Sequence, residues 1–399
     1  MPSAMFVDDR FIGVAAKFFA LFGPPRKGGG AVAVYLHGEP VVDIWAGFAA
    51  PGRRWQRDTM AMAYSTGKGV AATVLHRLAD RGLIDYDAAV ADYWPEFAAN
   101  GKAGITVRDV LRHRAGLQQI RGLLPDKADL LDHDAVAAAL AVSAPDPLRY
   151  KASGYHAITF GTLVAEICQR VTGRDFRDLV RQELAVPLGE SDFWFGVPVH
   201  ERGRLAKLGP RMSVAKLPVD GLLGIAAAVP PLRSLRGVLY DGMLNSAQVS
   251  DTVYDAMMPG WNGVFTARSL ARMYGAIAND GLVGNQRLLR SDTAARIAEM
   301  PFNSKYDYVL GGPPNHSLGY HRAIVGTHIR RDALGHFGIG GSGAMAMPRL
   351  GLSIAFVTNH LGNMVSTLGD ARLPVLAAIA ARAARELPET ESVRSAAAS

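Results

Sequence analysis

At positions 64 to 69 the chain reads Tyr-Ser-Thr-Gly-Lys-Gly, and a run of small or apolar residues follows. The spacing of that run predicts a buried helix that begins near Ser65 and ends at Arg81, just before Gly82. Residues three positions apart lie on one face of a helix, so Ser65 Oγ and the Lys68 amine should lie side by side. The free N–H groups of the first turn point to the same place and suit a developing negative charge.

A serine hydroxyl becomes a nucleophile when a base takes its proton. Lys68 could be that base if burial lowered its pKa from about 10.4 toward neutrality. The plainer alternative is that Ser65 caps a helix and Lys68 is a surface charge. A second Ser-x-x-Lys occurs at residues 213–216, but Pro218 follows and would end a helix at once. We therefore treat Ser213 as a chance match.

The composition sets limits on the class of protein. With 399 residues, 49% hydrophobic and 20% charged, the chain can form one large or two medium domains. The net charge of +7 comes from scattered arginines rather than a basic run, which disfavours nucleic-acid binding. The one cysteine, Cys168, is expected to be buried and inert. No cysteine and histidine spacing matches a zinc site, so we expect neither a metal nor another cofactor.

The N-terminal apolar stretch at residues 11–23 follows two aspartates and is interrupted by Lys17. A signal peptide has a basic start and an uninterrupted apolar core. The spacing of the phenylalanines instead predicts an amphipathic helix packed on a sheet. No segment is long enough to span a membrane, so we expect a cytoplasmic protein without a membrane partner.

Strand patterns occur at both ends of the chain. Residues 31–36 and 41–47 surround a turn and are typical of a β-hairpin. Three further antiparallel strands are expected near the C-terminus, at residues 316–325, 333–347 and 352–359. The sequence therefore predicts an α/β (α+β) fold with a central antiparallel sheet formed from both termini and flanked by helices. Residues 1–82 and 301–399 would form this domain, and residues 83–300 an inserted, mainly helical domain.

Tyr155 is a second candidate catalytic residue, in a Gly-Tyr-His-Ala segment that precedes an apolar helix pattern. Its phenol could relay a proton from Ser65 to a leaving alkoxide. If it were hydrogen-bonded to Ser65 and close to the Lys68 cation, its own pKa would fall. The commoner alternative for such a tyrosine is packing at a domain boundary.

A glycine-rich segment at residues 335–343 is the third candidate. Five glycines in nine residues weaken a strand, and close approach of a ligand to the backbone is one reason to have them. A backbone N–H there could pair with the Ser65 N–H as an oxyanion hole. The residues expected to bind the oxyanion or the substrate are His336, Gly338, Ile339 and Gly340. A bulged edge strand with a glycine-rich turn is the alternative.

The same segment contains a near match to the nucleophile elbow Gly-x-Ser-x-Gly, at residues 340–344. Its last glycine is replaced by Ala344, and no helix pattern follows. The only later histidine, His360, precedes Asp370, whereas the elbow enzymes have the order serine, acid, histidine. Ser342 is therefore a poor candidate for the nucleophile.

Together, the order and spacing of these motifs resemble the serine β-lactamase and penicillin-binding-protein superfamily, and most closely its class C-like esterases, the family VIII carboxylesterases. The similarity runs along nearly the whole chain. The segments that carry it are His37-Gly-Glu39, Ser65-Thr-Gly-Lys68-Gly69, Val110-Leu-Arg-His-Arg-Ala-Gly-Leu117, Gly154-Tyr-His-Ala157 and Gly335-His-Phe-Gly-Ile-Gly-Gly-Ser342.

This resemblance implies a role for each candidate. Ser65 matches the acylated nucleophile, and Lys68 the lysine that activates it. Tyr155 matches the tyrosine of the family's Tyr-x-Asn motif, although Tyr150 offers a rival alignment. Tyr155 is preferred because the helix after it then begins where the family's helix does.

Two departures from the family pattern bear on the substrate. Ala157 stands in place of the asparagine, and His336-Phe337-Gly338 in place of Lys-Thr-Gly. In β-lactamases the polar groups of those motifs help to hold the ligand's carboxylate and amide. The resemblance therefore implies a serine carboxylesterase that cleaves short-acyl, small-molecule esters through a Ser65 acyl-enzyme. An acyltransferase or an amide or β-lactam hydrolase, and a non-catalytic binding protein that retains the fold, are the alternatives.

Overall fold

The central sheet is built from both ends of the chain, as the sequence predicts. A computed structural model describes residues 4–22, 28–126, 128–147, 152–208, 251–299, 306–310, 315–361 and 370–385. Within these ranges a nine-stranded antiparallel sheet has the order β1-β3-β2-β14-β13-β12-β11-β10, with β4 paired to β3. Its N-terminal strands are β1 (Phe6–Val7), β2 (Gly29–Leu36), β3 (Glu39–Ala50) and β4 (Arg53–Arg54). Its C-terminal strands are β10 (His316–Ser317), β11 (Tyr320–Val325), β12 (His328–Phe337), β13 (Gly343–Met347) and β14 (Leu352–Thr358).

Strands β2 and β14 join the two ends of the chain, with Ala33 opposite Ala355 and Val34 opposite Ile354. Successive side chains of a strand point to opposite faces of the sheet. The larger residues, such as Val34 and Ile354, belong to one apolar cluster, and Ala33 and Ala355 belong to the other. Small alanine side chains on the second face let helices approach that side of the sheet closely.

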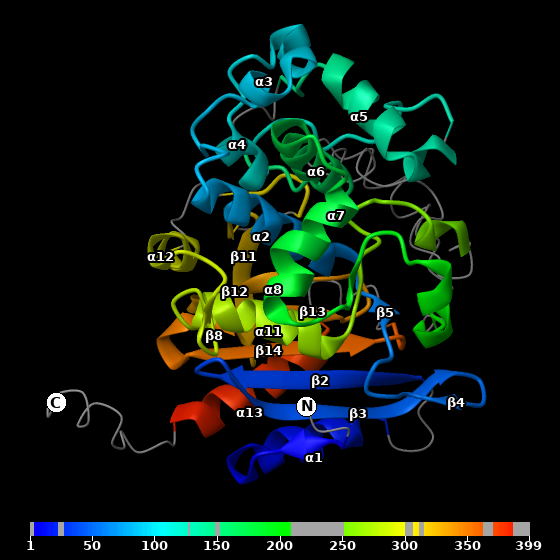
Figure 1. Ribbon diagram of the computed structural model, residues 1–399, viewed down its shortest axis with the longest axis vertical. Coiled ribbons are helices and arrows are strands. Elements are labelled where there is room, and N and C mark those ends of the chain that lie inside the picture. The colour runs from blue at the N-terminus through cyan, green and yellow to red at the C-terminus, as the bar shows by residue number, and fades with distance from the viewer. Residues whose placement is uncertain are drawn as a thin grey trace, which may run out of the picture.

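Helices cover both faces (Figure 1). Helices α1 (Ile12–Ala20) and α13 (Arg372–Arg385) pack together against the face with the larger side chains. Helix α11 (Ala267–Ala278) packs against β2, β13 and β14 on the other face, and α2 (Gly67–Asp80) contacts β11 and β12. The molecule is therefore a helix–sheet–helix sandwich, and α2 lies on the side of the sheet that faces the remaining helices.

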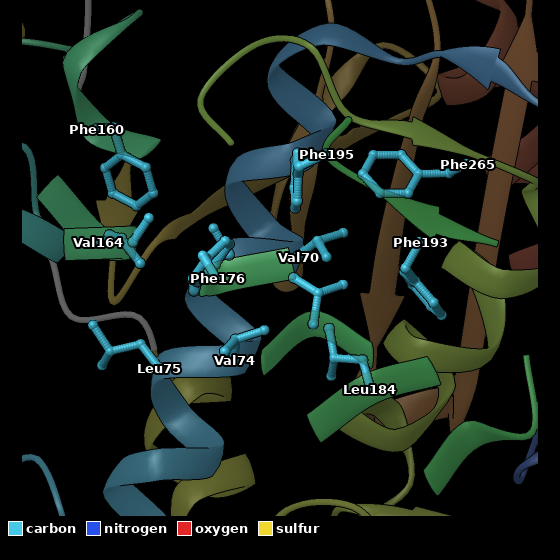
Figure 2. Packing of buried hydrophobic residues seen from close by; sticks show 14 of the residues in the cluster. Val70, Val74, Leu75, Phe160, Val164, Phe176, Leu184, Phe193, Phe195 and Phe265 are labelled. Carbon is cyan, nitrogen blue, oxygen red and sulfur yellow. The ribbon is translucent and has the colours of Figure 1, made fainter. Parts of the chain in front are cut away.

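Helix α2 is buried on nearly all sides, which confirms the sequence-based prediction. Apolar residues of α2, including Val70 and Val74, lie among phenylalanines from several other segments (Figure 2). One side of α2 packs against α6 (Thr159–Thr172). All four residues of its first turn, 67–70, are buried, so the surrounding protein fixes the position of this turn.

The remaining helices and short strands lie between the two halves of the sheet in the sequence. The helices are α3 (Val90–Tyr93), α4 (Val107–Leu111), α5 (His133–Val142), α7 (Phe176–Val180), α8 (Val186–Leu188) and α12 (Ser291–Glu299). The short strands are β5 (Ala61–Met62), β6 (Phe193–Trp194), β7 (Val264–Phe265), β8 (Leu282–Val283) and β9 (Gln286–Arg287). Helix α4 begins with a capping box, in which Thr106 and Asp109 bond reciprocally. Within the described residues no helix is long and apolar enough to cross a membrane.

Two strand predictions are wrong. The expected strand at residues 316–325 is two short strands, β10 and β11, which pair with each other antiparallel. The expected strand at residues 333–347 is likewise two strands, β12 and β13, joined by a turn at residues 338–342. Gly340 and Gly341 have φ values of 94° and 105°, which glycine adopts without strain, so the chain reverses here. We call residues 338–342 the glycine turn.

The division into a sheet domain and an inserted domain at 83–300 stays a prediction. Helix α11 falls within the inserted range by sequence but packs against the central sheet. The second Ser-x-x-Lys, at residues 213–216, and the tail after Pro388 lie outside the described residues.

Candidate active site

Ser65 lies where a short strand turns into α2. Strand β5 pairs with β7, and the Ala63 N–H donates to the Gly263 carbonyl at 2.8 Å, which fixes the chain just before the turn. Tyr64 has a φ of 49°, a left-handed conformation that is costly for a tyrosine. Residues Tyr64–Thr66 then form one 3-10 turn that leads into α2. The strained turn leaves Ser65 half-buried at the N-terminal end of a rigid helix.

Lys68 follows one turn later and points back at the serine. Its Nζ lies 3.0 Å from Ser65 Oγ and 2.6 Å from the Ala157 carbonyl, and it also bonds the Gly260 carbonyl. The side chain has no exposed surface. No carboxylate pairs with it in the part of the chain that the structure describes. The three contacts therefore join α2, the start of α6 and the segment before β7 at one nitrogen atom.

Burial lowers the pKa of the Lys68 amine well below its usual value, because an unpaired ammonium loses its hydration inside a protein. A neutral amine has two N–H donors and one lone pair. The carbonyls of Ala157 and Gly260 can accept the two N–H groups. The lone pair is then left for the remaining neighbour, the Ser65 hydroxyl, which is the geometry of a general base.

Tyr155 comes to the same place from the segment before α6. Its hydroxyl forms a hydrogen bond with Ser65. The Lys68 Nζ lies 5.0 Å from the centre of its ring. The three residues singled out in the sequence, Ser65, Lys68 and Tyr155, are thus brought together from two distant segments. Their catalytic roles stay a prediction.

The expected direction of the Tyr155 pKa shift is wrong. Burial raises the pKa of the Tyr155 phenol, and the hydrogen bond to Ser65 only partly opposes this effect. The expectation assumed a cation at Lys68, but the same burial favours the neutral amine there. The phenol therefore stays protonated and can donate a hydrogen bond rather than act as a phenolate base.

The glycine turn lies against the backbone that leads into Ser65. A Cβ on Gly338 would come within 2.0 Å of the Ala63 carbonyl oxygen, so only glycine allows this contact. The Ser342 carbonyl accepts hydrogen bonds from the Gly338 N–H at 2.8 Å and from the Thr66 hydroxyl at 3.2 Å. One carbonyl thus ties the glycine turn directly to the residue after Ser65.

Of the other residues predicted to bind the oxyanion or the substrate, Ile339 and Gly340 lie on this turn, and His336 lies near the end of β12. Ile339 is half-buried, and the Gly340 carbonyl accepts a hydrogen bond from Arg372 at 2.6 Å. The His336 ring lies 6.2 Å from the Tyr155 ring, centre to centre. Ser342 is itself buried, and its Oγ accepts from the Thr358 N–H at 3.1 Å. Ser342 is therefore a structural serine, in agreement with its rejection as a nucleophile.

Several histidines surround Tyr155 and form what we call the histidine cluster. Its members are His113, His156, His316, His321 and His336. The His156 N–H donates to Nδ1 of His113 at 3.1 Å, and the Leu117 N–H donates to Nε2 of His156 at 3.1 Å. A ring nitrogen that accepts a hydrogen bond carries no proton. Burial lowers the pKa of His156 and of His321 to about 4, so both are neutral at pH 7.

Sequence reasoning missed the Gly260 carbonyl, the histidine cluster and Asp307. Asp307 is fully buried and accepts from the Ser153 hydroxyl at 2.9 Å. The histidines are spread over residues 113–336, so nothing in their spacing signals a cluster. Within the described residues, no group of three or more histidine, cysteine or acidic side chains could hold a metal ion. Cys168 is buried, and burial raises its thiol pKa.

Comparison with known proteins gives the family. The sequence model of the beta-lactamase family matches residues 18–379. The chain belongs to the beta-lactamase family. A relative from Mycobacterium tuberculosis named esterase/beta-lactamase LipL is 42% identical over 364 residues, which cover 89% of this chain and 82% of the relative.

Solved structures of the beta-lactamase family agree. The crystal structure of a family VIII carboxylesterase is 34% identical, with a TM-score of 0.83, and the match covers 95% of this chain and 98% of that one. A penicillin-binding protein homologue from Caulobacter crescentus is 32% identical, with a TM-score of 0.79 and the same coverage. These matches confirm the resemblance and the fold class, and they support the prediction of a serine ester hydrolase.

The substitution Lys68→Met tests the neutral state of the amine. A depressed pKa means that the unfolded chain binds a proton that the folded chain lacks, at every pH between the folded pKa and about 10.4. Lys68 therefore makes a contribution to the wild-type free energy of unfolding that rises with pH across this interval. The variant lacks this contribution because methionine does not titrate. The melting temperature of Lys68→Met minus that of the wild type should decrease from about pH 6 to about pH 9. A constant difference would contradict the depressed pKa.

The histidine cluster should make the protein acid-sensitive before its carboxylates titrate. His156 has a pKa of about 4 in the fold and about 6.5 when unfolded. The unfolded state thus binds more protons, and stability is lost as the pH falls from about 6.5 to about 4. His156→Gln should melt lower at pH 7 but show a flatter decline of melting temperature over this range. His200→Gln, at a side chain 79% exposed, is the control and should keep the wild-type slope.

Gly338→Ala tests the contact between the glycine turn and the nucleophile segment. The new Cβ would force the turn away from Ala63, because the separation of 2.0 Å is far below any van der Waals contact. Loss of one oxyanion donor costs about 10²- to 10³-fold in kcat, and a fall in kcat of this order is expected for esters. Gly203→Ala is the matched control, since a Cβ there meets nothing within 4 Å. An unchanged kcat in Gly338→Ala would show that the position of the glycine turn does not affect catalysis.

Proposed function

We propose that this chain hydrolyses carboxylic esters through an acyl-enzyme on Ser65. The observation that carries the proposal is the environment of Lys68. Its buried amine has no carboxylate partner among the described residues and lies 3.0 Å from the Ser65 hydroxyl. A surface lysine beside a helix cap, the plainer alternative from the sequence, would have a hydrated amine. The names of the related proteins, an esterase/beta-lactamase and a carboxylesterase, support the same activity.

In the acylation half-reaction, Ser65 Oγ attacks the ester carbonyl carbon as its proton passes to the Lys68 Nζ. The carbonyl oxygen becomes an oxyanion, and the backbone N–H groups of Ser65 and Ile339 are proposed to stabilise it. The carbon–oxygen bond to the leaving group then breaks. The proton held by Lys68 returns to the departing alkoxide, and the Tyr155 hydroxyl, bonded to Ser65, can pass it on.

In the deacylation half-reaction, water takes the place of the alcohol. A water molecule gives a proton to the neutral Lys68 amine and attacks the acyl carbon. The bond to Ser65 Oγ breaks, the serine recovers the proton from Lys68, and the carboxylic acid leaves. Lys68 thus accepts and returns one proton in each half-reaction, which requires a pKa near the working pH.

The charges around the site favour neutral substrates. Burial lowers the pKa of His336 well below its usual value, so the residue that replaces the family's lysine is uncharged. Lys68 is neutral by the same cause. A substrate carboxylate would lose its hydration without gaining a cation from either residue. Short-acyl, neutral esters are therefore the proposed substrates, rather than anionic β-lactams.

Ser65→Ala should abolish the hydrolysis of short p-nitrophenyl esters while leaving the melting curve unchanged, because the hydroxyl is the attacking group. The control Ser213→Ala removes the serine of the second Ser-x-x-Lys and should stay within a few-fold of the wild-type rate. The assay should include esters of increasing acyl length and one β-lactam. Wild-type activity in Ser65→Ala would end the proposal, and preferred turnover of the β-lactam would overturn the substrate class.

A further inference from the structure

We propose that Asp307 is a positioning residue for Tyr155, holding the phenol against Ser65 from a segment 152 residues away. This inference rests on the proposed function, in which Tyr155 transfers a proton to the leaving group. Asp307 does not touch the reacting atoms. Its carboxylate contacts the Tyr155 N–H, the Ser153 hydroxyl two residues earlier, and the His316 ring, which stacks against the tyrosine.

The first contact is with the chain that carries the tyrosine. The Tyr155 N–H donates to Oδ1 of Asp307 at 3.3 Å, and the Ser153 hydroxyl donates to Oδ2 at 2.9 Å. Ser153 and Asp307 also form a parallel β-bridge, in which the Tyr308 N–H donates to the Ser153 carbonyl at 3.1 Å. Residues 153–155 are therefore tied to residues 307–308 by both backbone and side chain.

The second contact is with the segment of Asp307 itself. The N–H groups of Val309 and Leu310 both donate to Oδ1 of Asp307 at 2.9 Å. Oδ1 thus collects three N–H donors, one from the Tyr155 segment and two from its own turn. A carboxylate that accepts several N–H groups is held in one orientation, and so are its donors.

The third contact acts on the tyrosine ring. His316 Nε2 lies 3.5 Å from Oδ2 of Asp307, and the His316 ring stacks on the Tyr155 ring at 5.5 Å with an angle of 13° between the planes. Burial opposes ionisation of Asp307, but the bonds from His316, Leu310 and Ser153 outweigh it and lower its pKa to about 2. The carboxylate is therefore charged at every pH at which the enzyme would work, and it fixes both backbone and ring.

The placement of Asp307 fits a positioning role better than a purely structural one. A buried carboxylate is costly to keep unless it is fully hydrogen-bonded, and apolar packing could hold a loop at lower cost. Proton relay between Ser65 and Tyr155 depends on a hydrogen bond, and a shift of about 1 Å in such a contact can cost about 100-fold in rate. The gain in rate from holding Tyr155 in one position can therefore offset the free-energy cost of burying the Asp307 carboxylate.

The experiment is a double-mutant cycle between Asp307 and Tyr155, with kcat and KM measured for a p-nitrophenyl ester per folded molecule. Asp307→Ala should lower kcat by about 100-fold with KM within about twofold, because only the chemical step needs the phenol in place. Asp307→Asn keeps the acceptor Oδ1 and should recover kcat to within about tenfold of the wild type. In a Tyr155→Phe background the effect of Asp307→Ala on kcat should shrink to less than about threefold.

A matched control separates positioning from stability. Asp192 is likewise buried and pairs with Arg204 at 2.8 Å, but its side-chain partners among the described residues, Ser191 and Arg204, lie outside the Tyr155 segment. Asp192→Ala should lower the melting temperature with kcat within about threefold of the wild type per folded molecule. If Asp307→Ala fails to fold, Ser153→Ala takes its place and should lower kcat about threefold in the wild-type background and not at all with Tyr155→Phe.

Two results would overturn the inference. One is a wild-type kcat in the folded Asp307→Ala or Ser153→Ala variant. The other is an equal loss of kcat when Asp307→Ala is made in the wild-type and in the Tyr155→Phe background. That result would mean that Asp307 stabilises the fold but does not position Tyr155. Neither result touches the proposed function, which fails only if Ser65→Ala remains active.

Discussion

The burial of the Lys68 amine is the constraint on which the rest of the site depends. An ammonium without a carboxylate partner cannot stay charged in a dry interior, so the fold itself sets the protonation state of the base. Two carbonyls, from Ala157 and Gly260, accept its N–H groups and leave the lone pair for Ser65. Burial without a counter-charge thus favours the neutral amine, and no second acid–base group is needed to deprotonate the lysine.

Close backbone contacts make that burial possible. A Cβ on Gly161 would lie 1.8 Å from the Gly260 nitrogen, and a Cβ on Gly260 would lie 2.5 Å from the Ile158 carbonyl oxygen. A Cβ on Gly67 would meet the Pro259 carbonyl at 2.9 Å. These glycines let α2, α6 and the segment before β7 meet with almost no side chain between them. The contact of the Gly260 carbonyl with Lys68 is therefore a consequence of packing between backbones, in the same way as the contact of Gly338 with Ala63.

Local patterns in the sequence were enough to predict the hairpin, the buried helix after Ser65 and the antiparallel sheet from both termini. Each of these elements is recognised from the spacing of apolar residues within its own segment. They could not predict that residues 333–347 form two strands, because the turn is required by contact with Ala63, 275 positions before Gly338 in the chain. They also gave the wrong direction for the Tyr155 pKa, because charge at Lys68 depends on burial. The position of Asp307 beside Tyr155 arises from the same kind of long-range contact.

A site made of neutral groups places a condition on the chemistry. In a medium of low dielectric constant, a free ammonium and a free oxyanion are each costly, whereas the two together attract strongly at short range. In the proposed mechanism, proton transfer from Ser65 to Lys68 is therefore favourable only as the oxyanion forms and the backbone N–H groups stabilise it. The hydroxyl of Tyr155, kept protonated by burial, can stabilise the attacking oxygen without adding a charge of its own. Burial lowers the pKa values of His113, His156, His321 and His336, so these four rings add no charge to the resting site.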